Sequence, residues 1–356
     1  MGPLPIIRTD LMLESLGIFF LSGHFIAKNF AQMSPVTNAI NRLKVRTSFS
    51  LLMQLSYSLF PHFFTIDDLS DMSRGTKVVW DDSSWRFEGW VVPAKSGKNA
   101  RVAISFHGFD RSASEMENFM PFYCDDTALL SVNLLHHGES KPLDDLHIYS
   151  MLEPSVLLEV LKRKIHEEFG EGVEKLELLG YSMGSRVCFR LLTERPTDFS
   201  RIIVLAPDGL CKSIMYKFVV NTRLGRFCWS LVDRYPKTNK RIIDSLYKVG
   251  LISEHKHHFG RYHTDNSEIR KRVAYGWAAH KKFWPELGDL ASAISKVEAH
   301  VVFGNRDKII PEKWSRGLKY ELSKMGCDSV QFHTIESGHV MRHAATVEQI
   351  VFAIKS

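Results

Sequence analysis

A five-residue segment, Gly180-Tyr181-Ser182-Met183-Gly184, carries the residue types and spacing most suggestive of chemistry in this chain. Its serine stands between two glycines in a G-x-S-x-G pattern. Glycines tolerate the strained, closely packed backbone of a sharp turn, and such a turn lifts a serine hydroxyl clear of its surroundings. A hydroxyl presented in this way acts as a nucleophile when a neighbouring base takes its proton.

The segments on either side of this serine are those that such a turn requires. Residues 173–179 alternate apolar and polar side chains, which predicts a strand, and residues 185–192 have helical spacing that ends near Pro196. A helix that begins just after the serine directs its N-terminus, and the amide of Met183, at negative charge developing on a bound carbonyl oxygen. We therefore favour a nucleophile over a purely structural glycine turn.

The chain from residue 76 onward has the pattern of strands that alternate with helices. Expected strands are residues 76–80, 85–92, 100–106, 127–135, 200–206, 297–303 and 329–334, and expected helices are residues 112–122, 153–169, 311–324 and 340 onward. This alternation predicts an α/β protein with a mostly parallel sheet covered by helices on both faces. In such sheets the functional residues gather at the carboxyl ends of the strands.

Two polar residues near the C-terminus are candidates for the base and its orienting acid. Asp307 follows the strand at 297–303, and His339 follows the last expected strand. A serine needs a base in contact, and that base needs a third group to orient it. Asp208 also follows a strand and is an alternative acid, while His343, one helical turn beyond His339, is an alternative base.

In their order along the chain, these motifs resemble those of the α/β-hydrolase superfamily. The resemblance extends from about residue 76 to the C-terminus, apart from an insert. It rests on the turn His107-Gly108, the loop 137–140 (HGES), the serine turn, the G-x-x-D of residues 304–307 and the pair Gly338-His339. It implies that Ser182 is the nucleophile, His339 the general base and acid, and Asp307 the residue that orients the histidine.

The same resemblance implies an oxyanion hole made by the backbone amides of Phe109 and Met183, with no cofactor and no metal ion. The sequence departs from the superfamily at Asn133 and His136, where relatives commonly carry Asp and Gly, and its HGFD turn argues against the branch of esterases with HGGG. Ser182 excludes the aspartate nucleophile of dehalogenases and epoxide hydrolases. His107 and His137 are expected to shape loops, and Asp110 to line the site or to cap the following helix.

The expected organisation has four parts: an N-terminal helical extension (1–75), the first part of a hydrolase core (76–210), a helical cap insert (211–288) and the second part of the core (289–356). The resemblance places the cap over the site. Many aromatic residues in the insert predict either an apolar pocket for an acyl group or a small core of the insert itself.

Charge is distributed unevenly along the 356 residues. The net charge is +6, yet residues 211–290 contain 16 Lys plus Arg and 7 Asp plus Glu, a local net of +9. This localised surplus argues against a nucleic-acid-binding protein. The five cysteines are scattered and form no C-x-x-C pair, which argues against a disulfide framework or a zinc site and predicts a reducing, cytoplasmic compartment.

Two apolar runs near the N-terminus, residues 11–27 and 48–64, raise the question of a membrane. The first is interrupted by polar residues and is shorter than the roughly 20 apolar residues of a spanning helix, and it lacks the pattern of a secretory signal. We expect two helices packed on the main domain, with attachment to a membrane surface as the alternative. The basic insert is compatible with peripheral contact with an anionic membrane, and the alternative is a basic solvated surface that binds no ligand.

The function expected from these features is that of a serine hydrolase that cleaves a carboxylic ester or thioester of a small-molecule acyl substrate through an acyl-enzyme intermediate. The alternatives on the same residues are an acyltransferase and a carbon–carbon bond hydrolase. A third alternative, from a different class, is a non-catalytic binding protein of the same fold. The sequence indicates neither the acyl chain nor the oligomeric state.

Overall fold

A computed structural model of the chain describes residues 74–355 apart from 144–145, 148–149 and 213. The two N-terminal apolar runs and nearly all of the predicted extension therefore lie outside the described residues. Within the described part, no helix is both long and apolar enough to cross a bilayer.

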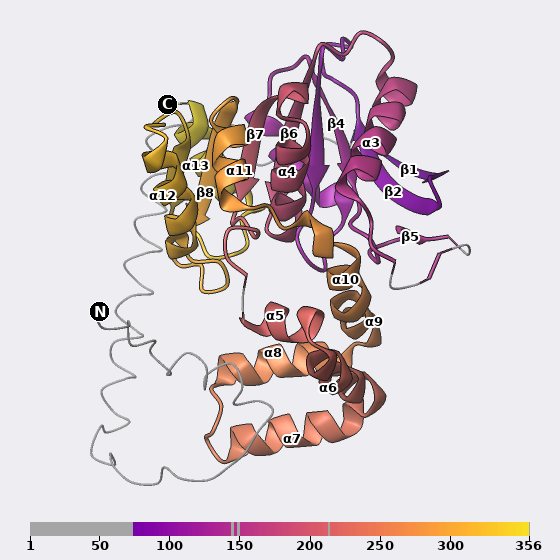
Figure 1. Cartoon of the computed structure of the whole chain (residues 1–356), viewed down its shortest axis with the longest axis vertical. Helices are drawn as coiled ribbons and strands as arrows, with labels where there is room; N and C mark the ends of the chain where they lie inside the picture. The colour runs from indigo at the N-terminus through magenta and orange to yellow at the C-terminus, as the bar shows by residue number, and fades with distance from the viewer. Residues whose placement is uncertain (1–73, 144–145, 148–149, 213, 356) are drawn as a thin grey trace, which may run out of the picture. The chain divides into compact units, whose positions relative to one another are not determined.

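A mixed sheet forms the centre of the described part (Figure 1). Its order is β1-β2-β4-β3-β6-β7-β8-β9, with the short strand β5 paired to β2. The pairs from β4 through β9 are parallel, whereas β2 pairs antiparallel with β1, β4 and β5. The strands are β1 (Thr76–Asp82), β2 (Trp85–Val92), β3 (Arg101–Phe106), β4 (Thr127–Val132), β5 (Lys141–Pro142), β6 (Lys175–Tyr181), β7 (Phe199–Leu205), β8 (Glu298–Gly304) and β9 (Gln331–Ile335).

Helices cover both faces of this sheet, because its central strands are apolar on both sides. The first face packs against α3 (Pro154–Phe169), α4 (Met183–Glu194), α11 (Leu287–Ile294) and α12 (Arg316–Lys324). The second face packs against the 3₁₀ helix η2 (Ala113–Phe122) and α13 (Ala344–Lys355). Short 3₁₀ turns, η3 (Pro196–Asp198) and η6 (Glu312–Ser315), complete these connections.

A helical insert lies in the chain between β7 and β8. It comprises α5 (Ile214–Asn221), α6 (Arg223–Arg234), α7 (Pro236–Lys248), α8 (Glu254–Asp265), α9 (Ser267–Lys271), the π-helical turn η4 (Arg272–Gly276), α10 (Trp277–Ala279) and the 3₁₀ turn η5 (Lys281–Phe283). Side-chain caps fix three of these helices at their starts: Thr222 before α6, Ser253 before α8 and Asn266 before α9.

Two local expectations are corrected by the structure, and a third is refined. The strand predicted to reach residue 135 ends at Val132, because Leu134 turns to donate its amide to the buried ring of His107 and His136 has φ +65°. The helix expected over residues 112–122 is present as a 3₁₀ helix over residues 113–122, with Pro121 inside it. The last helix begins at Ala344 rather than at residue 340.

Candidate active site

Ser182 lies at the junction of β6 and α4, in a backbone conformation that few residues adopt. Its φ is +49° and its ψ is −117°. Its amide donates to the carbonyl of Leu205 at 2.8 Å, and its carbonyl accepts from the amide of Asp208 at 3.1 Å, so β7 and the loop after it hold the turn on both sides. The strained turn is thus supported by neighbouring backbone.

The two glycines of the motif are required by close approach of the backbone. A side chain at Gly184 would overlap the carbonyl group of Phe106 at the end of β3, and one at Gly180 would overlap the backbone of Ser185. Helix α4 can therefore begin directly over the sheet edge only if both positions lack a Cβ. The predicted strand–turn–helix is present.

Ser182, His339 and Asp307 lie in contact with one another. The Ser182 Oγ is 3.1 Å from His339 Nε2, and His339 Nδ1 is 2.7 Å from Asp307 Oδ2. A carboxylate only accepts hydrogen bonds, so Nδ1 carries the hydrogen and Nε2 presents its lone pair to the serine hydroxyl. Asp307 is buried, and its Oδ1 accepts from the amides of Ile309 at 2.7 Å and Ile310 at 2.9 Å.

Tyr181 holds the histidine in place and was not recognised from the sequence. Its hydroxyl donates to the carbonyl of His339 at 2.6 Å, and the two rings stack with centroids 5.9 Å apart. Tyr181 is the last residue of β6, directly before Ser182, so one turn fixes both the serine and the histidine backbone. A tyrosine at the variable position of G-x-S-x-G was the available signal.

Asp208, the alternative acid, faces a different partner. Its Oδ2 lies 3.8 Å from Nε of Arg186, a buried arginine in the first turns of α4. The guanidinium lies against the rings of Tyr216 and Trp284, 5.1 and 4.7 Å from their centroids. Burial raises the pKa of Asp208, and the charge of Arg186 opposes that rise. Asp208 therefore balances a buried cation, while His339 is oriented by Asp307.

The loop after β3 passes beside the serine. A Cβ on Gly108 would lie 3.2 Å from the Cβ of Ser182, so the backbone reaches the serine closely enough to contribute an amide. Phe109 follows it directly. Met183 is the first residue of α4, where a helix has no internal acceptor for its amide. These positions are compatible with the predicted pair of oxyanion donors.

Two buried histidines support this loop, as expected from the sequence. Leu134 donates its amide to Nε2 of His107 at 3.0 Å, and Asp110 donates its amide to Nε2 of His137 at 3.1 Å. Both rings must therefore be neutral and carry the hydrogen on Nδ1, which faces a backbone carbonyl in each case. Burial lowers the pKa of His107 to about 4 and that of His137 well below its ordinary value.

Asp110 does not cap the following helix, contrary to one of the two expectations for it. Its carboxylate accepts hydrogen bonds from Tyr262 and Arg272, both in the insert. Ser112 is the residue that precedes η2. No pattern in the sequence indicates these partners, which lie about 150 positions further along the chain.

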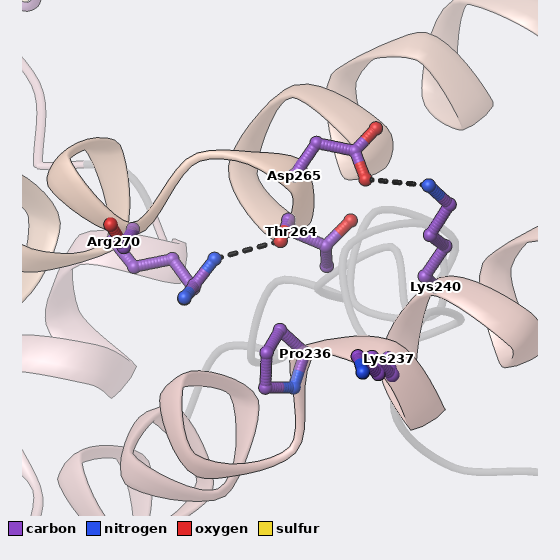
Figure 2. Close-up of a pocket in the computed structure, with 7 residues that line it drawn as sticks. Pro236, Lys237, Lys240, Thr264, Asp265 and Arg270 are labelled. Atoms are coloured by element: carbon purple, nitrogen blue, oxygen red, sulfur yellow. Dashed lines mark hydrogen bonds and ion pairs between the residues drawn. The ribbon is translucent and has the colours of Figure 1, made fainter.

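A separate surface pocket lies within the insert (Figure 2). Its walls are Pro236, Lys237, Lys240, Thr264, Asp265, Ser267 and Arg270. Lys240 pairs with Asp265 at 3.1 Å, and Arg270 donates to the carbonyl of Thr264 at 2.7 Å, so two of its cationic groups are already engaged. None of the predicted site residues lines it, and we assign it no role.

The chain is similar to known proteins both in sequence and in fold. No protein-family model matches the chain. Among curated proteins it is similar to the uncharacterized hydrolase YugF of Bacillus subtilis (strain 168), with 22% identity over 250 residues that cover 68% of this chain and 84% of YugF.

Two solved structures share the arrangement of elements. MGS-M2, an α/β hydrolase enzyme from a Medee basin deep-sea metagenome library, matches with a TM-score of 0.54 and 14% identity, covering 78% of this chain and 97% of MGS-M2. A thermophilic esterase from Thermogutta terrifontis matches with a TM-score of 0.52 and 16% identity, covering 79% of this chain and 96% of the esterase. This chain has the α/β-hydrolase fold. The fold class predicted from the sequence is confirmed.

The geometry of this α/β-hydrolase site predicts which aspartate supports the histidine. We expect Asp307→Asn to lower the turnover number by about 10⁴-fold, because an amide favours the wrong histidine tautomer. Asp208→Asn should lower it far less, because that carboxylate faces Arg186. Steady-state kinetics of both variants on the same ester measure the difference. A larger loss in Asp208→Asn would show that the acid is misassigned.

Buried histidines near the site predict acid sensitivity. Burial lowers the pKa of His280 to about 3, below the value of about 6.5 expected in the unfolded chain. Between these values the unfolded state binds more protons, so the free energy of unfolding falls as pH falls below about 6.5. We expect His280→Gln to reduce this slope by about 1 kcal/mol per pH unit, measured by urea unfolding between about pH 6 and about pH 5.

The exposed residue His258 provides the control for this measurement. His258→Gln replaces a histidine at an exposed position and should leave the slope unchanged. An unaltered slope in His280→Gln would contradict the assignment of a neutral, buried ring.

Proposed function

We propose that this chain is a serine hydrolase that cleaves a carboxylic ester or thioester through an acyl-enzyme intermediate. The observation that carries the proposal is the continuous set of contacts from Ser182 Oγ through His339 to the buried carboxylate of Asp307. Its hydrogen-bond directions are those in which a serine hydroxyl can give up its proton. The similarity to YugF, described as a hydrolase, points in the same direction.

In the first half of the reaction, Ser182 Oγ attacks the carbonyl carbon of the acyl group while its proton passes to His339 Nε2. The electron pair of the carbonyl bond moves to the oxygen, which we place at the amides of Met183 and Phe109. The intermediate collapses as His339 donates the proton to the leaving oxygen or sulfur. The acyl group stays on Ser182.

In the second half, water attacks the acyl carbon and gives a proton to His339 Nε2. Collapse of the second intermediate returns that proton to Ser182 Oγ and releases the carboxylic acid. Asp307 stays ionised and stabilises the imidazolium that forms in each half. An acyltransferase would differ only in admitting an alcohol in place of water.

A binding protein of the same fold is the less economical interpretation. Asp307 is buried and makes three hydrogen bonds, one of them to His339, while Tyr181 fixes the carbonyl of the same histidine. Burying a carboxylate carries a desolvation cost that an apolar pair in its place would avoid. We attribute its presence to the proton transfer that it supports.

Replacement of the serine tests the proposal. Ser182→Ala should abolish covalent labelling by a fluorophosphonate probe and lower hydrolysis of short p-nitrophenyl esters by about 10⁴–10⁶-fold, without loss of the folded state. Ser185→Ala, one turn along α4 and also buried, is the matched control and should still be labelled. Labelling of Ser182→Ala at the wild-type rate would overturn the assignment.

We further propose that the substrate reaches the enzyme from an anionic membrane through the outer face of α6 and α7, which we call the α6–α7 face. Its exposed apolar residues include Leu224, Phe227 and Leu231, spaced three and four apart on one side of α6, and Ile242 on α7. Between residues 223 and 248 there are 7 Lys plus Arg and 2 Asp plus Glu, a net of +5. Exposed apolar side chains on a segment with a net positive charge fit a membrane interface with anionic lipid.

Vesicle binding tests this partner. The protein should co-sediment with phosphatidylserine–phosphatidylcholine vesicles, less with phosphatidylcholine alone, and less again in high salt. Reversing Arg223, Arg241 and Lys248 to Glu should weaken binding by at least about a hundredfold, because the three lost cations alone account for about 1 kcal/mol each. Reversing Lys98, Lys175 and Lys313, exposed residues outside the insert, is the control and should change it little.

Equal binding to both kinds of vesicle, or an equal effect of the two triple variants, would contradict the proposal that the substrate comes from an anionic membrane. Hydrolysis of a short soluble ester should stay near the wild-type rate in both variants, so the result is independent of the catalytic assignment.

A further inference from the structure

Asp110 occupies a position that the hydrolytic mechanism does not use. It follows Phe109, whose amide is a proposed oxyanion donor, and its own φ is +57°. A non-glycine residue in this left-handed region persists only where its surroundings hold it there. The groups that hold Asp110 therefore also constrain the backbone that adjoins the Phe109 amide.

Two sets of contacts hold Asp110 from opposite sides. Its amide donates to the neutral ring of His137 at 3.1 Å, on the side of the sheet. Its two carboxylate oxygens accept from Arg272 and from Tyr262, on the side of the insert. Hydrogen bonds between a carboxylate and a guanidinium are among the strongest in proteins.

The ring of Phe109 is held in the same manner. It meets His137 edge-on, with centroids 5.8 Å apart, on the side of the sheet. On the insert side it stacks on His263, with centroids 6.5 Å apart, and meets Trp277 at 6.3 Å. The insert thus contacts both residues that flank the proposed amide donor.

A π-helical turn lies at the place where the insert contacts Phe109 and Asp110. Arg272 is the first residue of the π-helical turn η4, and Trp277 directly follows that turn. A π-helical turn adds a residue to a helix and changes the direction of the side chains on it, and such turns often occur at functional sites. Here the turn presents Arg272 and Trp277 to consecutive residues of the same loop.

We propose that Asp110 is a positioning residue through which the insert holds the Phe109 amide in the oxyanion hole. The inference rests on the proposed function. When the tetrahedral intermediate forms, the carbonyl electron pair moves to oxygen and the Phe109 N–H must already point at it. Displacement of Tyr262 and Arg272 releases Asp110 from its strained conformation and turns that amide away. Hydrolysis therefore requires the contacts that Tyr262 and Arg272 of the insert make with Asp110.

The variants Asp110→Asn and Arg272→Met, alone and combined, test the proposal. We expect each to lower kcat on a short soluble p-nitrophenyl ester by about 10- to 100-fold, because a displacement of about 1 Å costs up to about 100-fold. KM should change little, since the amide acts on the transition state rather than on the bound ester. The double variant should lose no more than the worse single variant, because both changes remove one contact.

A second readout isolates the oxyanion hole. A trifluoromethyl ketone forms a tetrahedral adduct with the serine, whereas the matched methyl ketone does so poorly. Binding of the trifluoromethyl ketone should weaken in parallel with kcat/KM in each variant, and binding of the methyl ketone should not. A role confined to shaping the pocket would change KM and both ketones together, and that result would overturn the proposal.

Asp233→Asn is the matched control, since Asp233 binds Arg270 at 2.9 Å wholly within the insert. It removes an ion pair of similar kind and should leave kcat unchanged. If Asp110→Asn does not fold, Tyr262→Phe, which removes a single hydroxyl, should still lower kcat several-fold.

The outcomes separate the two proposals. An unchanged kcat in Asp110→Asn and Tyr262→Phe, with Ser182→Ala inactive, overturns the inference alone. Full activity in Ser182→Ala overturns the proposed function, whatever Asp110 does.

Discussion

The strained backbone at Ser182 is the constraint on which the rest of the site depends. A φ of +49° with a ψ of −117° costs on the order of 1–3 kcal/mol for a residue with a side chain. It is held because β7 and the loop after it bond the serine amide and carbonyl, and because α4 starts against the end of β3 at Gly184. Tyr181 and Ser182 then point to the same sheet edge, where Asp307 and His339 arrive from β8 and β9.

Around this turn, some side chains are buried, neutral hydrogen-bonding groups and others form a charged pair. Burial lowers the pKa of His107 to about 4 and that of His280 to about 3, and both neutral rings hydrogen-bond to nearby backbone. The guanidinium of Arg186 lies against two aromatic rings, and the carboxylate of Asp208 lies beside it. His339 differs from these histidines because it is partly exposed and lies between a carboxylate and a hydroxyl.

Features set by short stretches of sequence were predictable, and those set by distant partners were not. The hairpin β1–β2, the parallel strands and the strand–turn–helix at Ser182 follow from periodicity and glycine placement, and Asp307 and His339 follow from their position after strands. The early end of β4 could not be predicted, because it depends on the amide of Leu134 reaching His107 on another strand. His136 shows the same limit: its backbone has a φ of +65°, and no local signal in the sequence predicts that conformation for a histidine.

The packing of the insert explains why its contacts with the sheet domain matter. Within it, Val219, Trp229 and Val273 form one small cluster of buried apolar residues, and Ile243, Leu246 and Ile252 form another. Clusters of this size bury too little apolar area to fix several helices alone. The rest of the described chain also holds the insert: Phe283 packs in the main core, Tyr216 lies against Arg186, and Phe109, Asp110 and the backbone of Leu152 contact its helices. Because Phe109 and Asp110 belong to the loop beside Ser182, a shift of the insert would disturb the groups around that serine.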